Sequence, residues 1–116
     1  MPIAQITVSE NLAAVVRDKA DEITGSIVRI LTEDFPANRD LVQVTFTAAI
    51  APVFGKEVLC QVFHRASDAR TAEIRAAVAD KLRDTLHHFT GQSVRVRLMA
   101  LDSAVIAASD TPETSA

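Results

Sequence analysis

Residues 3–6 read IAQI, and residues 59–62 read LCQV, so two short apolar stretches with a shared glutamine lie 56 residues apart. Each belongs to a predicted strand, residues 3–8 (IAQITV) and residues 57–64 (EVLCQVFH). The helical stretches that follow them also align, at an offset of 55 residues. In that alignment Ile23, Ile27 and Leu31 correspond to Val78, Leu82 and Leu86. The sequence therefore predicts a duplicated unit.

The first predicted helix extends from Leu12 to about Asp34, where apolar side chains recur every three or four residues between charged ones. Gly25 interrupts it at a cost of about 1 kcal/mol relative to alanine, so we expect close packing at this position. The helix should end at Phe35, because the residue before a proline is excluded from the helical region. The second helix is predicted over residues 71–88, with Gly91 as a stop signal.

Two alternating segments complete the repeats, residues 41–47 (LVQVTFT) and residues 93–99 (SVRVRLM). Each repeat, residues 2–48 and residues 57–100, is then a β-α-β unit with a right-handed crossover between parallel strands. The predicted fold is α+β, a two-layer sandwich in which both helices cover one face of a four-stranded mixed sheet. Residues 1–102 form the single domain, and residues 103–116 form a C-terminal tail, either frayed or docked on a partner.

The alternation also divides the strand side chains between the two faces of the sheet. The face under the helices is predicted to hold Val42, Val44, Phe46, Val94, Val96 and Leu98. The opposite face is polar but mostly uncharged, with Gln5, Thr7, Gln43, Thr45, Gln61, Arg95 and Arg97. A solvent-exposed face usually carries more lysine and glutamate, which favours packing against other subunits. A hydrated sheet face is the alternative.

The composition is that of an ordinary globular domain, with 116 residues, 48% hydrophobic and 23% charged, and a formal charge of -3. The mild acidity argues against nucleic acid or an anionic membrane surface as a partner. There is neither an apolar run long enough to span a membrane nor a signal peptide, so we expect a cytoplasmic protein. Cys60 is the single cysteine, which excludes an intrachain disulfide and a cysteine-based metal site.

Pro2, directly after the initiator methionine, is the first candidate for chemistry. Methionine is normally removed before a small residue, which would leave a secondary amine at the N-terminus. An α-amino group has a pKa near 7.7–8.0, and an apolar pocket with cationic neighbours would lower it enough for a neutral general base. Many proteins begin with Met-Pro only because it is processed cleanly. The strand that starts immediately behind Pro2 favours catalysis, because it would hold the amine rigidly.

These residues resemble the tautomerase superfamily, whose amino-terminal proline lies on a duplicated β-α-β unit. Residues 2–6 (PIAQI) look like the start of the 4-oxalocrotonate tautomerases. The double length, with residues 9–12 (SENL) and Phe35-Pro36, is more similar to the 5-(carboxymethyl)-2-hydroxymuconate isomerases. Residues 69–73 (ARTAE) resemble the segment of that family that enters the second helix. The resemblance extends from residue 2 to about residue 102.

The resemblance implies a macrophage migration inhibitory factor-like fold, a homotrimer, and an isomerase that needs no metal or other cofactor. Its substrate would be a small anionic unsaturated keto or enol acid. Pro2 would move a proton between oxygen and carbon, and Arg70 and Arg39 would bind carboxylate and polarise the carbonyl, since the planar donor fork of arginine suits a carboxylate. Arg95 lies in a segment similar to a strand of the short tautomerases, and Phe46 is a candidate aromatic wall.

Each of these assignments has a structural alternative. Arg70 is alternatively a solvated arginine at a helix start, Arg39 a loop arginine, and Arg95 a structural or interface residue. Tryptophan and tyrosine are absent, so Phe46, Phe54 and Phe63 are the only aromatic side chains left for the pocket. For the whole protein, the alternative function is that of a trimeric binding protein that kept the fold and lost the activity.

The remaining reactive residues carry weaker signals. His87 and His88 are adjacent at a helix end and cannot face the same way, so with His64 they favour structural roles over a metal site. Cys60 lies within a strand and is expected to pack as a small apolar side chain. The sequence has no glycine-rich phosphate loop, no G-x-S-x-G elbow and no H-E-x-x-H zinc motif.

Overall fold

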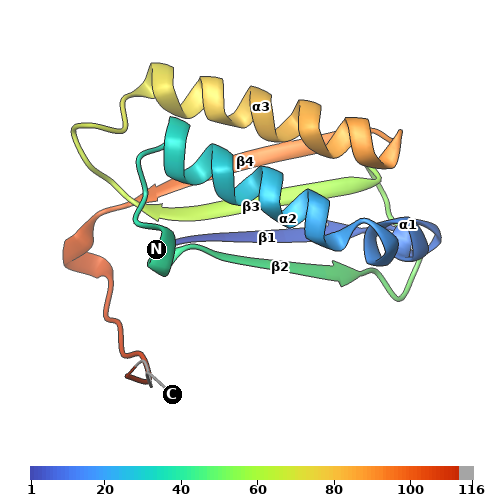
Figure 1. The fold of residues 1–116 in the computed structure, drawn as a ribbon, viewed down its shortest axis with the longest axis horizontal. Helices are drawn as coiled ribbons and strands as arrows, with labels where there is room; N and C mark the ends of the chain where they lie inside the picture. The colour runs from blue at the N-terminus through green and yellow to red at the C-terminus, as the bar shows by residue number, and fades with distance from the viewer. Residues whose placement is uncertain (113–116) are drawn as a thin grey trace.

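The computed structural model describes residues 1–112, which form a two-layer α+β domain (Figure 1). One layer is a four-stranded sheet in the order β2-β1-β3-β4. Its strands are β1 (Pro2–Val8), β2 (Gln43–Ala48), β3 (Val58–Arg65) and β4 (Val94–Leu101). Each β-α-β unit pairs its two strands in parallel, and the units join through the antiparallel pair of β1 and β3. The predicted duplication, mixed sheet and fold class are confirmed.

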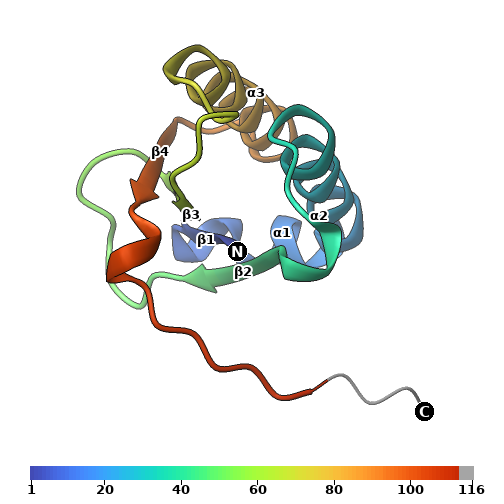
Figure 2. The same ribbon diagram turned by 90° about the vertical axis from the view of Figure 1, so that its left-hand side faces the viewer.

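The helices α1 (Ala13–Asp18), α2 (Ala20–Arg29) and α3 (Ala72–Thr90) all cover the same face of the sheet (Figures 1 and 2). The single helix predicted from Leu12 to Asp34 is wrong in detail. Its backbone breaks at Lys19, and a 3-10 turn (Glu10–Leu12) precedes α1 while a π-helical turn (Ile30–Asp34) follows α2. Helical periodicity in side chains is insensitive to such breaks, because the apolar stripe continues through them. None of these helices has the length and hydropathy of a membrane-spanning helix.

The two glycines singled out in the helices behave differently. A side chain added at Gly25 would meet nothing within 4 Å, so the predicted close packing there is wrong. Gly91 ends α3 in the left-handed region at φ 67°, as expected of a C-terminal helix stop. At the other end of α3, the Thr71 hydroxyl accepts a bond of 3.2 Å from the backbone N–H of Ile74. This cap fixes the start of α3 at Ala72, two residues after Arg70.

The core lies between the sheet and the helices. The inner strands contribute Ala4, Ile6, Val8, Val58, Cys60 and Val62, and the helices contribute the aligned stripe Ile23, Ile27, Leu31, Val78, Leu82 and Leu86. All of these side chains are almost completely buried. Burial raises the pKa of the Cys60 thiol to about 12, and Cys60 packs as the small apolar residue that was predicted.

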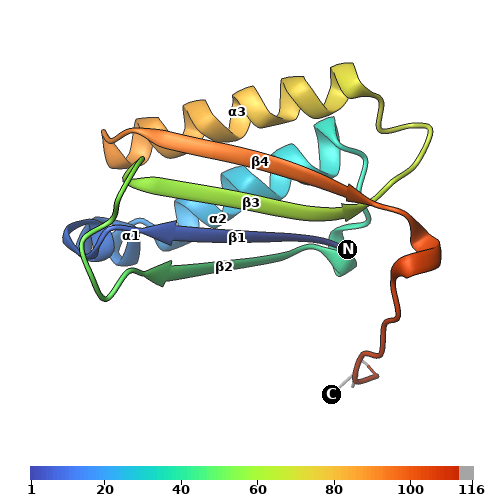
Figure 3. The same cartoon turned by 180° about the vertical axis from the view of Figure 1, so that it is seen from behind.

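The opposite face of the sheet has no helices over it (Figure 3). The prediction of a polar face was incomplete, because the register also places apolar side chains there, namely Ile3, Leu59, Phe63, Met99 and Leu101. These side chains are only half-buried within the chain. After β4, a 3-10 turn (Ser103–Val105) begins the predicted C-terminal tail, of which residues 113–116 lie outside the described part of the chain.

Candidate functional site

The site forms at the end of the sheet where the chain begins. Pro2 is the first residue of β1, is buried, and pairs with His64 in the antiparallel register of β1 and β3. The end of β3 and the loop that leads to α3 therefore lie beside the N-terminus (Figures 1 and 3). The segment after α2 reaches the same end of the molecule before β2 starts. Pro2 thus lies where both repeats meet.

A cavity of about 420 Å³ opens at this place. It is bounded by the N-terminus, the segment before β2, the loop between β3 and α3, and the turn after β4. The residues that decide its chemistry are Met1, Asn38, Leu41, Arg65, Arg70 and Ser103. The size is that of a site for a small molecule, since ligand cavities in proteins usually measure about 300–1,000 Å³.

Arg70 is held rigidly at the wall of the cavity. Its Nη1 donates to the backbone oxygen of Arg65 at 2.9 Å, and its Nε donates to the backbone oxygen of Phe35 at 3.3 Å. The guanidinium carbon lies 4.5 Å from the centre of the Phe35 ring, a cation–π geometry. A guanidinium has five N–H donors, so the two backbone bonds leave others for a ligand. Arg70, expected from the resemblance to bind a carboxylate, thus lines the same cavity as Met1.

The cavity is electropositive. Within residues 1–112 neither Arg65 nor Arg70 forms a salt bridge with a carboxylate. The pKa of the amine at Met1 is lowered by burial first and then by the charges of Arg65 and Arg70, while Asp110 of the C-terminal segment opposes the shift. Burial also lowers the pKa of the Arg70 guanidinium. Such a site attracts an anion and favours a neutral amine.

His64 lies behind this wall and is completely buried. Its Nδ1 is 3.0 Å from the backbone oxygen of Arg65, and since that oxygen only accepts, Nδ1 carries the proton. The ring meets Phe35 edge-on, with centroids 4.6 Å apart at 84°. Within the described residues Nε2 has no hydrogen-bond partner. Burial lowers the pKa of His64, and the charges of Arg70 and Arg75 lower it further. The hydrogen bond to the Arg65 oxygen acts in the opposite direction and raises the pKa.

This lowered pKa predicts a loss of stability in mild acid. Below about pH 6.5 the unfolded chain binds a proton at this histidine that the folded chain does not. The free energy of unfolding should therefore fall with pH, by at most about 1.4 kcal/mol per pH unit, from about 6.5 down to the folded pKa. Urea unfolding at pH 7.5 and 5.5 should show a smaller acid loss in His64→Asn than in the wild type and in His87→Asn. Equal losses in all three proteins would contradict the buried neutral histidine.

Two of the other predicted site residues, Arg39 and Arg95, do not join Arg70 within one chain. Arg39 begins a 3-10 turn (Arg39–Leu41) and is exposed, and it is its neighbours Asn38 and Leu41 that line the cavity. Arg95 pairs with Leu59, on the uncovered face and towards the opposite end of the sheet from Pro2. Of the arginines predicted for the site, Arg70 is the one that lines the N-terminal cavity of a single chain.

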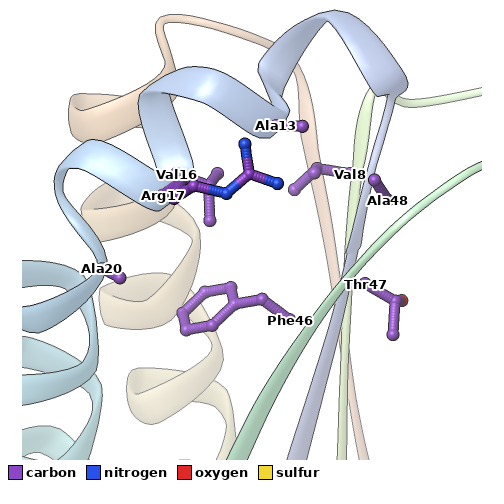
Figure 4. Close-up of a pocket in the computed structure, with 8 residues that line it drawn as sticks. All are labelled: Val8, Ala13, Val16, Arg17, Ala20, Phe46, Thr47 and Ala48. Carbon is purple, nitrogen blue, oxygen red and sulfur yellow. The ribbon is translucent and has the colours of Figure 1, made fainter.

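Phe46 lies in a separate hollow of about 210 Å³ between β2 and the first helices (Figure 4). It pairs with Ile6, four residues along β1 from Pro2. Val16 and Ala20 come from the helical side of that hollow, and the Arg17 guanidinium extends across it in Figure 4. Within one chain, the assignment of Phe46 to the wall of the Pro2 site therefore has no geometric support.

Three residues of the site, namely Phe35, His64 and Arg65, were not identified from the sequence. Phe35 was treated as a helix end, and His64 was considered for a metal site. Arg65 ends β3, and the antiparallel pairing of β1 with β3 brings that end to Pro2. The duplication predicted both strands but not their mutual register, which would have identified Arg65. As for a metal, residues 1–112 hold no cluster of three or more histidine, cysteine, aspartate or glutamate side chains.

Comparisons with solved structures identify the fold. Native fused 4-OT aligns with a TM-score of 0.74 at 12% identity, over 91% of this chain and 91% of that one. The chain has the tautomerase, or macrophage migration inhibitory factor-like, fold. A macrophage migration inhibitory factor-like protein of Entamoeba histolytica gives a TM-score of 0.71 at 13% identity, with 93% of this chain and 95% of that chain covered.

A member of the cis-3-chloroacrylic acid dehalogenase family, N1, gives a TM-score of 0.77 at 15% identity, over 91% of this chain and 79% of that one. These structural neighbours are members of the tautomerase superfamily, and at such identities the likeness establishes the fold. No protein-family model and no curated protein matches the sequence.

Proposed function

We propose that the protein is a cofactor-independent tautomerase that interconverts the enol and keto forms of an unsaturated carboxylic acid, as the 5-(carboxymethyl)-2-hydroxymuconate isomerases do. The observation that supports this most is the cavity at the start of β1, where burial and then the charges of Arg65 and Arg70 lower the pKa of the Met1 amine. After removal of Met1, the amine would be the secondary nitrogen of Pro2 at the edge of that cavity. A neutral amine beside an anion site is what proton abstraction from an enol acid requires.

In the proposed reaction, the free donors of Arg70 bind the substrate carboxylate. The Pro2 nitrogen accepts the enol O–H proton, and the electron pair of that bond forms the carbonyl. The carbon–carbon double bond then takes the proton from the Pro2 ammonium, which returns to its neutral form. Arg39 remains a proposed second contact to substrate, on the strength of the family resemblance. The Arg65 guanidinium supplies further positive potential at the cavity wall.

The experiment that tests this proposal is covalent labelling together with an absorbance assay. The protein Pt0534, which gives a TM-score of 0.72 at 21% identity over 91% of this chain and 90% of that one, was solved after inactivation by 2-oxo-3-pentynoate. A neutral amine adds to such an acetylenic ketone. We expect one adduct, located by peptide mass at Pro2, and loss of the ketonisation of phenylenolpyruvate and 2-hydroxymuconate in proportion to labelling.

Intact mass must first show that Met1 has been removed. Arg83→Ala, on the exposed surface of α3, is the control and should label and turn over like the wild type. Loss of Met1 with neither an adduct nor turnover would overturn the proposal and support the alternative, a binding protein that has kept the fold.

We also propose that the chain forms a homotrimer through the uncovered sheet face. Phe63, Met99 and Leu59 are half-exposed there, and Ile50 and Phe54 are fully exposed in the loop between β2 and β3. Apolar side chains gathered in this way usually mark an interface. Two structural neighbours, both fused 4-OT proteins, are symmetric trimers.

Light scattering should give a mass three times the chain's 12.5 kDa. We expect Phe63→Asp to shift the protein to monomer, because it places a charge in the apolar face. Ala77→Asp, on the exposed surface of α3, should remain trimeric. A monomeric wild type at micromolar concentration would refute the interface.

A further inference from the structure

The wall of the cavity is a closed set of contacts among four residues. The backbone oxygen of Arg65 accepts from Arg70 Nη1 at 2.9 Å and from His64 Nδ1 at 3.0 Å. The centre of the Phe35 ring lies 4.5 Å from the Arg70 guanidinium carbon. The His64 ring meets the same Phe35 ring edge-on, with 4.6 Å between the two ring centroids. His64 and Arg70 therefore share two supports, one carbonyl and one aromatic ring, and Arg70 also donates to the Phe35 backbone oxygen.

We propose that His64 is a positioning residue for Arg70, which it orients through the Arg65 carbonyl and the Phe35 ring. The inference deepens the proposed function, on which its kinetic consequences rest. His64 does not line the cavity, so it acts without touching the substrate. It aims the free N–H donors of Arg70 into the cavity and thereby sets the affinity for carboxylate.

The burial of His64 supports this role. His64 is fully buried, and among residues 1–112 its Nε2 has no partner, which costs stability. A leucine of similar volume would avoid that cost. An apolar residue could not donate the bond that His64 Nδ1 makes to the Arg65 oxygen. Because that oxygen accepts from both His64 and Arg70, the direction of the Arg65 carbonyl is fixed. Arg75 contributes a further restraint, since its Nη1 donates to the backbone oxygen of Arg70 at 2.6 Å. The backbone and the side chain of Arg70 are thus held independently.

Three substitutions separate the two supports. His64→Asn keeps a hydrogen-bond donor near the Arg65 carbonyl but removes the ring. His64→Phe keeps a ring against Phe35 but removes the donor. His64→Leu removes both the donor and the ring. His87→Leu is the matched control, because His87 Nδ1 also bonds a backbone oxygen, that of Gln92 at 2.8 Å, but at the other end of α3.

The first readout is the NMR signal of the Arg70 Nε–H group, assigned by its loss in Arg70→Lys. In the wild type this proton bonds to the Phe35 oxygen and should exchange slowly with solvent. We expect fast exchange in His64→Leu, intermediate exchange in His64→Asn and His64→Phe, and no change in His87→Leu. This measurement requires no turnover, so it tests the positioning even if the proposed reaction fails.

The second readout is kinetic. His64→Leu should raise KM for phenylenolpyruvate up to about tenfold, with a smaller change in kcat, because a misaligned guanidinium weakens carboxylate binding. In the Arg70→Ala background the same substitution should add nothing. The proposal would be overturned if the Arg70 Nε–H proton exchanged as slowly in His64→Leu as in the wild type. It would also be overturned if His64→Leu raised KM by the same factor in the Arg70→Ala background as in the wild type.

Discussion

Pro2→Ala is expected to lower kcat for the ketonisation of phenylenolpyruvate by at least about 100-fold, in the range that positioned general bases contribute. The ring of Pro2 fixes the nitrogen at the start of β1, next to the place where burial and then the charges of Arg65 and Arg70 lower the pKa of the Met1 amine. Alanine replaces the rigid secondary amine by a freely rotating primary one, with a different basicity. Initial rates by absorbance, on samples whose N-terminus is verified by mass, measure the effect.

A second form of the same test blocks the nitrogen without changing Pro2. An uncleavable N-terminal extension turns the amine into an amide, which has no basic lone pair, so turnover should disappear. The same extension at the C-terminus is the control and should leave the rate unchanged. Equal rates in the Pro2→Ala, N-terminally extended and wild-type proteins would contradict the proline-base mechanism.

Arg70→Ala is expected to lower kcat/KM for the same substrate by about 100-fold or more. A hydrogen bond to a charged group contributes about 1.5–3 kcal/mol, and the guanidinium offers a carboxylate two donors at once. Arg70→Lys should recover little of the loss, because the ammonium keeps the charge but neither the planar fork nor the stacking on Phe35. Steady-state kinetics with both variants measures these changes.

Arg83→Ala provides the comparison for Arg70. This arginine also belongs to the α3 region, but it pairs with Asp80 and Asp84 on the solvent side, and its removal should leave kcat/KM within about twofold. Thermal unfolding of both variants shows whether the fold is intact. A folded Arg70→Ala protein with wild-type kcat/KM would exclude Arg70 from substrate binding and leave Arg39 as the arginine to test.

The elements of the fold were largely predictable because their signals are local. The alternation in residues 41–47 and 93–99 specifies strands, the stop at Gly91 specifies the end of α3, and Phe35-Pro36 ends the first helical segment. The break at Lys19 had no local signal, since charged and small residues around it are equally compatible with a continuous helix. The open space beside Gly25 depends on packing and could not be inferred from its type.

The site was predictable only in part. Pro2 and Arg70 have positions that follow from the repeat and its motifs, and the structure brings Arg70 to the cavity at the N-terminus. Arg95 and Phe46 illustrate the opposite case, because a residue's type and strand do not reveal which end of the sheet it occupies relative to Pro2. The parallel register of β1 with β2 settles this for Phe46, which pairs with Ile6. For Arg95 it is settled by the registers of β3 with β1 and with β4, because Leu59 pairs with both Thr7 and Arg95.

The sequence by itself determined the duplicated β-α-β unit, the mixed sheet with its helices on one face, and the proline at the start of the first strand. These follow from periodicities of about 2 and 3.6 residues, which require only neighbouring positions in the chain. The tertiary structure decided that Arg65, His64 and Phe35 surround Arg70 at the N-terminus. The physical reason is that these contacts join backbone carbonyls and rings from segments up to 35 residues apart, and only the pairing of the two repeats brings such segments together.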